Sequence, residues 1–327
     1  MSNPNNKVLV EAVNLVKEFD IPGGGFLAKN KSVVHAVSNV SIQIMEGETF
    51  ALVGESGCGK STLGRLLLRL IEPTSGHVKF EDMNINELKS HQMREMRKKM
   101  QIIFQDPYAS INPRMNVLRI IAEPLTTHRV YDSKAETREK VAELMQKVGI
   151  RPEFINRYPH QFSGGQRQRI GIARALALQP KLIVCDEPVS ALDVSIQSQI
   201  LNLLHNLQDE FHLTYLFISH DLSVVRYISD RVCVMFLGKV CETGRTEDIF
   251  TNPLHPYTKF LIDAVPKPDP FLRKENRQLL QGEIPSPVNP PAGCRFNTRC
   301  PYAKDICREK EPEMKIADNR QVACHMV

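Results

Sequence analysis

Short apolar runs alternate with amphipathic segments along most of the chain. Valine-rich or alternating apolar positions at 8–16 and 33–44 predict strands of an N-terminal sheet. Shorter apolar runs predict buried strands at Thr49–Val53, Ile102–Phe104, Leu182–Cys185, Tyr215–Ile218 and Arg231–Leu237. Apolar residues at helical spacing predict helices at Thr62–Ile71, Ser133–Val148, Gln166–Leu178 and Val194–Phe211. Strands that alternate with helices indicate an α/β protein with a parallel sheet.

Two regions depart from this alternation. Residues 106–162 open on a turn-rich stretch and then become helical, which predicts a helical subdomain inserted into the α/β core. From Asn252 onward, frequent prolines rule out long regular elements and predict a separate tail that is not shaped by a sheet. We therefore expect four segments, namely 1–105 with the N-terminal sheet, 106–162, 163–251 with the rest of the core, and 252–327 as a C-terminal extension.

Composition restricts the class of protein only coarsely. With 327 residues, of which 42% are hydrophobic, the chain can bury a large core. Its net charge of +5 is mild and its Lys and Arg are spread along the sequence, so nucleic acid is not indicated as a partner. No apolar run approaches the roughly 18 residues that would cross a bilayer, and the N-terminus lacks the apolar region of a signal peptide. We expect the chain in the cytosol, free or docked on a membrane partner.

A glycine-rich loop lies between a predicted strand and a predicted helix. Residues 54–61 match G-x-x-x-x-G-K-[ST], in which glycines let backbone N–H groups converge on phosphate oxygens at a helix N-terminus. Lys60 is expected to reach the β- and γ-phosphates, and Ser61 to bind Mg²⁺. The sequence therefore predicts an ATP site formed by Gly54, Glu55, Ser56, Gly57, Cys58, Gly59, Lys60, Ser61 and Thr62.

Polar residues follow three other predicted strands. The strand at 182–185 runs into Asp186 and Glu187, which we expect to hold Mg²⁺ and to polarise the attacking water, respectively. Gln105 and His220 each follow another strand, and the carboxyl ends of parallel strands meet at one sheet edge. Gln105 could couple metal or water to the helical subdomain, and His220 could contact the γ-phosphate. Taken singly, the acidic pair is equally compatible with a solvated edge, and a lone histidine at a strand end is more often a structural residue.

A second glycine pair opens a helix at Ser163-Gly164-Gly165-Gln166. One interpretation is a simple helix N-cap followed by a glycine turn. The other is a phosphate-binding helix N-terminus. Because the loop at 54–61 already has that role within the chain, we expect this segment to serve the nucleotide of a partner subunit.

Four cysteines are spaced C-x5-C-x6-C-x16-C in the proline-rich extension. Thiols at this density favour an iron–sulfur cluster, because a small extension needs a cross-link and disulfides are rare in a reducing cytosol. Zinc remains an alternative although the C-x2-C pairs of zinc ribbons are absent, and incidental thiols or disulfides remain a third. The residues are Cys294, Cys300, Cys307 and Cys324.

Over residues 8–250 the chain resembles the ATP-binding-cassette (ABC) ATPases. The resemblance rests on the order and spacing of the loop at 54–61, Gln105, the signature Phe162–Gln166, the Asp186-Glu187 pair, the Ser190–Asp193 segment and His220. It implies a head-to-tail dimer with two ATP molecules between loop and signature. Glu187 is then the general base, His220 the γ-phosphate switch and Asp193 a link across the dimer. Phe19 matches the adenine-stacking aromatic approximately, with an apparent insertion at 23–31 beside it.

Toward the C-terminus the chain resembles the second ATPase subunit of dipeptide/oligopeptide permeases. The matching features are Asn252–Thr258, Gly282–Pro287 and the cysteine array. This resemblance implies an ATP hydrolase that powers peptide import and a [4Fe–4S] cluster on the four cysteines. It also implies a heterodimer with a sister ATPase, two membrane permease subunits and a periplasmic peptide-binding protein, with the chain peripheral at the cytoplasmic face of the bacterial inner membrane. Haem precursors or nickel chelates as cargo, a soluble cassette ATPase and a redox-regulated nucleotide-binding module remain as alternatives.

Overall fold

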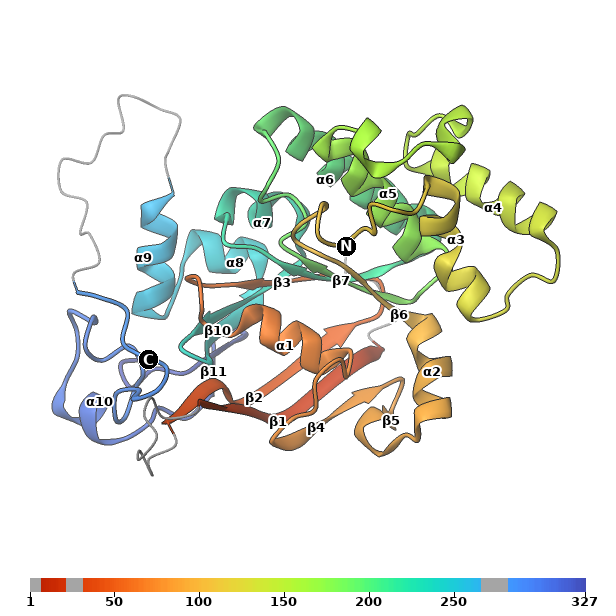
Figure 1. Cartoon of the computed structure of the whole chain (residues 1–327). Coiled ribbons are helices and arrows are strands. Elements are labelled where there is room, and N and C mark those ends of the chain that lie inside the picture. Colours follow the sequence, from red (N-terminus) through yellow and green to blue (C-terminus); the bar gives the residue numbers. More distant parts are fainter. Residues whose placement is uncertain (1–6, 22–31, 266–281) are drawn as a thin grey trace, which may run out of the picture. The chain divides into compact units, whose positions relative to one another are not determined.

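The computed structural model describes residues 7–21, 32–265 and 282–327 (Figure 1). The apparent insertion at 23–31 lies outside these residues. Two compact units emerge. The first contains Glu46–Glu48 and Leu88–Ile218, and the second contains Lys7–Met45, Thr49–Glu87 and Ser219–Val327. The four-segment division expected from the sequence stays a prediction.

In the first unit, three parallel strands form the centre. Strand β7 (Leu182–Asp186) lies between β6 (Met100–Ile103) and β8 (Thr214–Ile218), with Met100 opposite Leu182 and Asp186 opposite Ile218. Every residue of β7 and β8 is buried, as the continuous apolar runs predict for parallel strands covered on both faces. The predicted strands and their parallel arrangement are confirmed.

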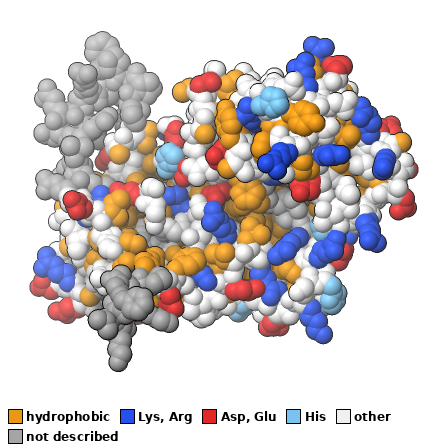
Figure 2. All heavy atoms as spheres, in the orientation of Figure 1, with side chains coloured by type: hydrophobic (Ala, Val, Ile, Leu, Met, Phe, Trp, Pro, Cys, Tyr) orange, Lys and Arg blue, Asp and Glu red, His pale blue; other side chains and the backbone are white. Residues whose placement is uncertain are grey.

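Helices make up the rest of the first unit. Figure 1 shows α3 and α4 beside α5. The predicted helix at 133–148 is confirmed as α4, and Ser133 caps it by accepting a hydrogen bond from the Ala135 N–H at 3.1 Å. Figure 2 shows Lys and Arg side chains interspersed with Asp and Glu on the visible face. The helices are α2 (Ser90–Lys99), α3 (Val117–Thr127), α4 (Lys134–Lys147), α5 (Gly164–Leu176) and α6 (Val194–Phe211), with short 3₁₀ turns η2 (Pro152–Asn156) and η3 (Pro159–Gln161).

The second unit carries the predicted N-terminal sheet, which is antiparallel. Its strand order is β2-β1-β4-β5, and its inward positions, such as Leu15, Val37, Ile44 and Phe80, are fully buried. Alternation of apolar and polar residues is what a sheet with one buried face requires. The strands are β1 (Val8–Ile21), β2 (Ser32–Met45), β4 (Ser75–Phe80) and β5 (Met83–Asn84), followed by the 3₁₀ turn η1 (Ile85–Glu87).

The second unit also contains a mixed set of strands. Strand β3 (Thr49–Val53) pairs in parallel with β9 (Arg231–Phe236), and β9 pairs antiparallel with β10 (Lys239–Arg245). Helix α1 (Lys60–Leu67) follows β3, while α7 (Leu222–Ile228) and α8 (Thr246–Thr251) flank the β9–β10 hairpin in sequence. The chain therefore has the expected α/β architecture with an additional antiparallel sheet.

The C-terminal extension corrects one prediction, because it is not free of sheet structure. It forms α9 (Pro256–Ala264), α10 (Asp305–Glu309) and the hairpin β11 (Lys315–Ala317) and β12 (Arg320–Val322). Strand β12 pairs with β10, with Val322 opposite Glu242. Prolines exclude long elements, but they leave room for strands of three residues that sequence periodicity cannot reveal.

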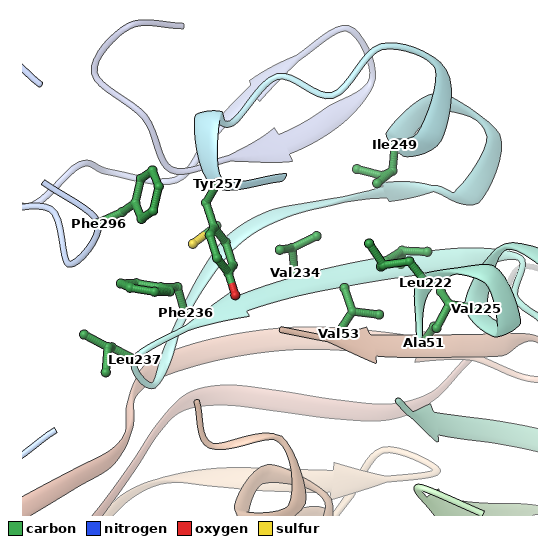
Figure 3. Packing of buried hydrophobic residues seen from close by; sticks show 12 residues of the cluster. Ala51, Val53, Leu222, Val225, Val234, Phe236, Leu237, Ile249, Tyr257 and Phe296 are labelled. Atoms are coloured by element: carbon green, nitrogen blue, oxygen red, sulfur yellow. The ribbon is translucent and has the colours of Figure 1, made fainter. Parts of the chain in front are cut away.

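Aromatic residues anchor the extension in the core of the second unit. Tyr257 and Phe296 are 0% and 1% exposed, and their ring centroids lie 4.8 Å and 5.3 Å from that of Phe236 on β9 (Figure 3). Each such ring buries a large apolar area, so the three together fix the extension against β9.

Among the described helices, none combines the length and apolar character needed to traverse a bilayer.

Candidate nucleotide-binding site

The loop at 54–61 connects β3 to α1 in the second unit, as the sequence predicts. Gly54 and Gly59 have φ angles of 150° and 103°. A Cβ atom on Gly54 would lie 2.1 Å from the Met235 carbonyl oxygen, and one on Gly59 would lie 2.2 Å from that of Ala36. Only glycine fits these two positions, because both the backbone angles and the neighbouring carbonyls exclude a side chain.

Lys60 occupies the loop that it is predicted to serve. Its side chain is buried, and its Nζ donates hydrogen bonds to the carbonyl oxygens of Gly54 at 2.8 Å and Glu55 at 2.9 Å. The N-cap of α1 is Gly59, so no side chain caps the first turn, which contains Ser61. A helix start without a side-chain cap, beside an ammonium group, is suited to phosphate.

Glu55, inside this loop, receives two contacts from the C-terminal extension that sequence reasoning missed. Its N–H donates to the Tyr257 hydroxyl at 2.9 Å, and its carboxylate accepts from both terminal nitrogens of Arg299 at 2.7 and 3.1 Å. The family resemblance used the segments around these two residues, but no local pattern connects positions so distant in sequence.

In the first unit, the structure brings together two of the predicted residues. Gln105 follows β6, and its Nε2 donates to Glu187 Oε2 at 2.9 Å. Glu187 follows β7 with a left-handed φ of 48°, and its N–H donates to the Ile218 carbonyl oxygen at 3.1 Å. Asp186, the last residue of β7, is only 4% exposed. The left-handed conformation of Glu187 is uncommon for a non-glycine residue and costs about 1 kcal/mol or more. Residues in such conformations cluster at functional sites.

His220 belongs to the second unit, directly before Asp221, which caps α7 by accepting from the N–H groups of Ser223 and Val224 at 2.8 and 3.4 Å. Phe19, on β1 of the same unit, is 40% exposed, and Lys17 Nζ lies 5.0 Å from its ring centroid. The γ-phosphate role of His220 and the adenine-stacking role of Phe19 stay predictions. So does the binding of one Mg²⁺ by Ser61, Gln105 and Asp186.

The Ser163–Gln166 segment has the geometry of a helix cap. Ser163 Oγ accepts from the Gln166 N–H at 3.3 Å, and the Ser163 N–H donates to Gln166 Oε1 at 3.1 Å, which is a reciprocal capping box. Gly165 packs tightly, since a Cβ there would lie 2.4 Å from Ile196 Cγ2, whereas one on Gly164 would lie 3.6 Å from Leu192 Cδ2. Binding of a partner's nucleotide by this segment stays a prediction.

Asp193 has a clear structural role. It caps α6, and its Oδ1 accepts from the Ile196 N–H at 3.0 Å and from Ser195 Oγ at 2.8 Å. The backbone and hydroxyl hydrogen bonds hold the pKa of this carboxyl below its usual value. A link from Asp193 across a dimer stays a prediction.

The four cysteines of the extension border one small cavity in the second unit, together with Phe296 and His325. Burial raises the pKa of Cys294 to about 11, and burial also raises the pKa of Cys300 and of Cys324. Across the described residues, however, no group of three or more His, Cys, Asp or Glu side chains is arranged to hold a metal ion. The shared cavity agrees with a common ligand set, while neither the iron–sulfur nor the zinc prediction gains a metal-binding arrangement.

Known proteins resemble this chain over its whole length. Residues 37–190 match the family described as "ABC transporter", and residues 241–307 match "Oligopeptide/dipeptide transporter, C-terminal region". The oligopeptide transport ATP-binding protein AppF of Bacillus subtilis (strain 168) is 53% identical over 330 residues, covering 100% of this chain and 99% of that protein. OppF of Escherichia coli (strain K12) is 52% identical over 320 residues, covering 97% and 96%.

A solved structure shares the fold. A dimer of the ATP-binding cassette MJ0796 in a post-hydrolysis state, bound to ADP and phosphate, has a TM-score of 0.65 at 30% sequence identity. The match covers 73% of this chain and 99% of that one. The predicted fold class is thereby confirmed.

Proposed function

Because the chain belongs to the ATP-binding proteins of oligopeptide and dipeptide ABC transporters, we propose that it supplies the ATP-driven step of peptide import. The chain is an ATPase coupled to transport. The single observation that carries the proposal is the phosphate-binding loop, with its two obligatory glycines and its inward-folded Lys60, in a chain similar over its full length to peptide-transport ATPases. The relatives described above are named for peptides, and none of them supports haem precursors as cargo.

The site residues divide into binding and chemical roles in this proposal. Lys60 and the N-terminus of α1 bind the phosphates of ATP, and Ser61, Gln105 and Asp186 hold Mg²⁺. Mg²⁺, when bound, neutralises charge that develops on the transferred phosphoryl group. Glu187 accepts a proton from the attacking water, and Gln105 orients the carboxylate of Glu187 through its 2.9 Å hydrogen bond.

The proposed assembly is a heterodimer with a sister ATPase. Ser163, Gly164 and Gly165 would then reach the nucleotide of the partner, and Asp193 would link the two subunits. The dimeric state of the related cassette MJ0796 supports this arrangement. The dimer would dock on two membrane permease subunits served by a peptide-binding protein, at the cytoplasmic face of the membrane.

The helical subdomain would receive the movement of the permease. Gln105 precedes the turn-rich segment that leads to α3, so a shift there would reach Glu187 through one hydrogen bond. Arg174 on α5 supports the same segment, because its Nη1 donates to the Ser110 carbonyl oxygen at 2.7 Å.

We also propose that Cys294, Cys300, Cys307 and Cys324 hold a [4Fe–4S] cluster, with Zn²⁺ as the alternative. Support comes from the cavity that all four border. Ligation needs thiolates, so binding would release protons from thiols whose pKa burial has raised. Anaerobically purified protein should contain about four iron and four sulfide per chain. Colourless, zinc-loaded protein would contradict the cluster.

Peptide uptake tests the transport proposal. Cells that depend on this chain for uptake of a labelled di- or oligopeptide should lose uptake with Lys60→Ala, since the phosphate-binding ammonium is removed. The matched control is Lys7→Ala, an exposed lysine at the start of the N-terminal sheet, which should leave uptake unchanged. Normal uptake with Lys60→Ala would refute the proposal.

A further inference from the structure

We propose that Tyr257 and Arg299 of the C-terminal extension are positioning residues for ATP binding, because together they hold the phosphate-binding loop through Glu55. The inference rests on the ATPase activity and not on the identity of the cargo. All three residues lie in the second unit. The extension would thus be a working part of the nucleotide site, in addition to its cysteine cavity.

Arg299 and Glu55 form an ion pair. Nη1 of Arg299 lies 2.7 Å from Glu55 Oε2, and Nη2 lies 3.1 Å from Oε1, so both carboxylate oxygens are engaged in parallel. The Arg299 side chain is 6% exposed and that of Glu55 is 21% exposed. A two-pronged pair with this little solvent access fixes orientation as well as distance, unlike an exposed ion pair.

The second step is the contact made by Tyr257. Its hydroxyl oxygen accepts the Glu55 N–H at 2.9 Å, and its ring is fully buried against Phe236 and Phe296. Figure 3 shows the ring among these residues, with its hydroxyl directed away from Phe296. Burial raises the pKa of Tyr257 well above its usual value, so the hydroxyl stays protonated. A rigid, packed acceptor therefore fixes the backbone of the loop at Glu55.

The third step connects Glu55 to the phosphate-binding cation. The carbonyl oxygen of Glu55 accepts from Lys60 Nζ at 2.9 Å. Glu55 thus uses its carboxylate for Arg299, its N–H for Tyr257 and its carbonyl for Lys60. These three interactions fix the start of the loop before ATP binds. Preorganisation of this kind favours binding because less ordering is needed when the ligand enters.

The alternative is that Arg299 only anchors the extension. The two roles differ in their consequences. An anchor would lower the stability of the protein and leave ATP affinity unchanged, whereas a positioning residue would raise the dissociation constant and the KM for ATP more than it changes kcat.

The experiment measures binding of a fluorescent ATP analogue, with Mg²⁺, to the purified full-length chain, together with KM and kcat and the unfolding temperature without nucleotide. Arg299→Met and Glu55→Gln should each raise the dissociation constant about ten- to hundredfold. The double variant should be no worse than the weaker-binding single variant, because both remove the same pair. Arg299→Lys should recover part of the affinity through one remaining contact.

The matched control is Arg295→Met, which removes a half-buried arginine from the same segment. Arg295 borders a cavity whose lining includes neither Glu55 nor Tyr257. This variant should leave the dissociation constant unchanged. Should Arg299→Met fail to fold, Tyr257→Phe decides the matter, since it removes one oxygen and should still weaken binding several-fold. Wild-type affinity in Arg299→Met or, failing that, in Tyr257→Phe would overturn the proposal, as would equal weakening by Arg295→Met. The measurement needs neither permease nor peptide, so its outcome is independent of transport.

Discussion

The phosphate-binding loop and the Ser163–Gln166 segment are both glycine-containing helix starts, yet they are held in place by different means. In the segment at 163–166, a capping box between Ser163 and Gln166 satisfies the N–H groups of these two residues. The loop depends on residues far along the chain, namely Tyr257 and Arg299. A locally specified site tolerates distant changes, whereas the loop is sensitive to the integrity of the C-terminal extension.

The largest expected effect separates the chemistry in the first unit from the binding in the second. Glu187→Gln should lower kcat of ATP hydrolysis about 10²- to 10⁴-fold, because the amide cannot take the proton of the attacking water. ATP affinity should be retained. Turnover assays and nucleotide titration would check this, with Glu210→Gln, an exposed carboxylate on α6, as the control. Undiminished turnover would remove Glu187 from the role of general base.

The next prediction concerns a contact that attaches the extension to β10, outside the phosphate-binding loop. Glu242 is fully buried on β10 and accepts from the N–H groups of Leu254 and His255 at 3.0 and 2.9 Å, while Arg320 lies 3.5 Å away. Glu242→Ala should lower the free energy of unfolding by about 3–5 kcal/mol, because it leaves the N–H groups of Leu254 and His255 without their acceptor and removes one of the two carboxylates that face the buried Arg320.

Urea denaturation would measure the effect of Glu242→Ala, and ATP affinity should fall alongside stability if the extension holds the loop. The control is Glu247→Ala on α8, an exposed position where the change should stay within about 0.5 kcal/mol. A stable Glu242→Ala protein with normal ATP affinity would contradict the dependence of the phosphate-binding loop on the C-terminal extension.

A smaller effect tests the locally specified segment. Gly165→Ala should cost about 1–3 kcal/mol, because its Cβ would fall 2.4 Å from Ile196 Cγ2, and Ile196→Ala should relieve the clash in the double variant. Gly164→Ala is the matched control, since its Cβ would meet only an ordinary contact at 3.6 Å. Thermal unfolding would rank the variants, and equal costs at the two glycines would show that packing on Ile196 is unimportant.

The smallest expected effect, taken per pH unit, is a dependence of stability on pH in the second unit. Burial lowers the pKa of His255 to about 3, and its neutral Nδ1 accepts the Tyr257 N–H at 3.0 Å. The unfolded chain gains a proton below its usual pKa of about 6.5 while the folded chain does not, so stability falls as pH drops from about 6.5 to about 3. The contribution approaches about 1.4 kcal/mol per pH unit. Denaturation curves of His255→Asn should show a shallower slope, and equal slopes would count against this origin.

Much of the fold could be predicted from the sequence where the signal is local. The bounds of β3 and α6 equal the predicted ones. Helix α1 ends at Leu67, earlier than the predicted Ile71, because Arg69 already adopts a left-handed φ of 48°. The pairing of β12 with β10 could not be predicted, since three residues carry no measurable periodicity.

The site shows the same limit. Strand ends predicted the meeting of Gln105 with Glu187, because residues that follow parallel strands share an edge. Nothing in the loop motif predicted Arg299, since an ion pair between residues 55 and 299 follows from the tertiary packing of aromatic rings around Phe236.

Because Glu55 pairs with the extension, a shortened form of this ATPase must keep the extension to retain an intact phosphate-binding loop. The segment shared with ABC transporters in general spans residues 37–190, yet two of the groups that hold Glu55 come from beyond residue 251. A version cut after Thr251 would strip the aromatic cover from Phe236 and leave the Glu55 carboxylate without its guanidinium. Chimeras that graft this cassette onto another transporter should therefore carry residues 252–327 with it.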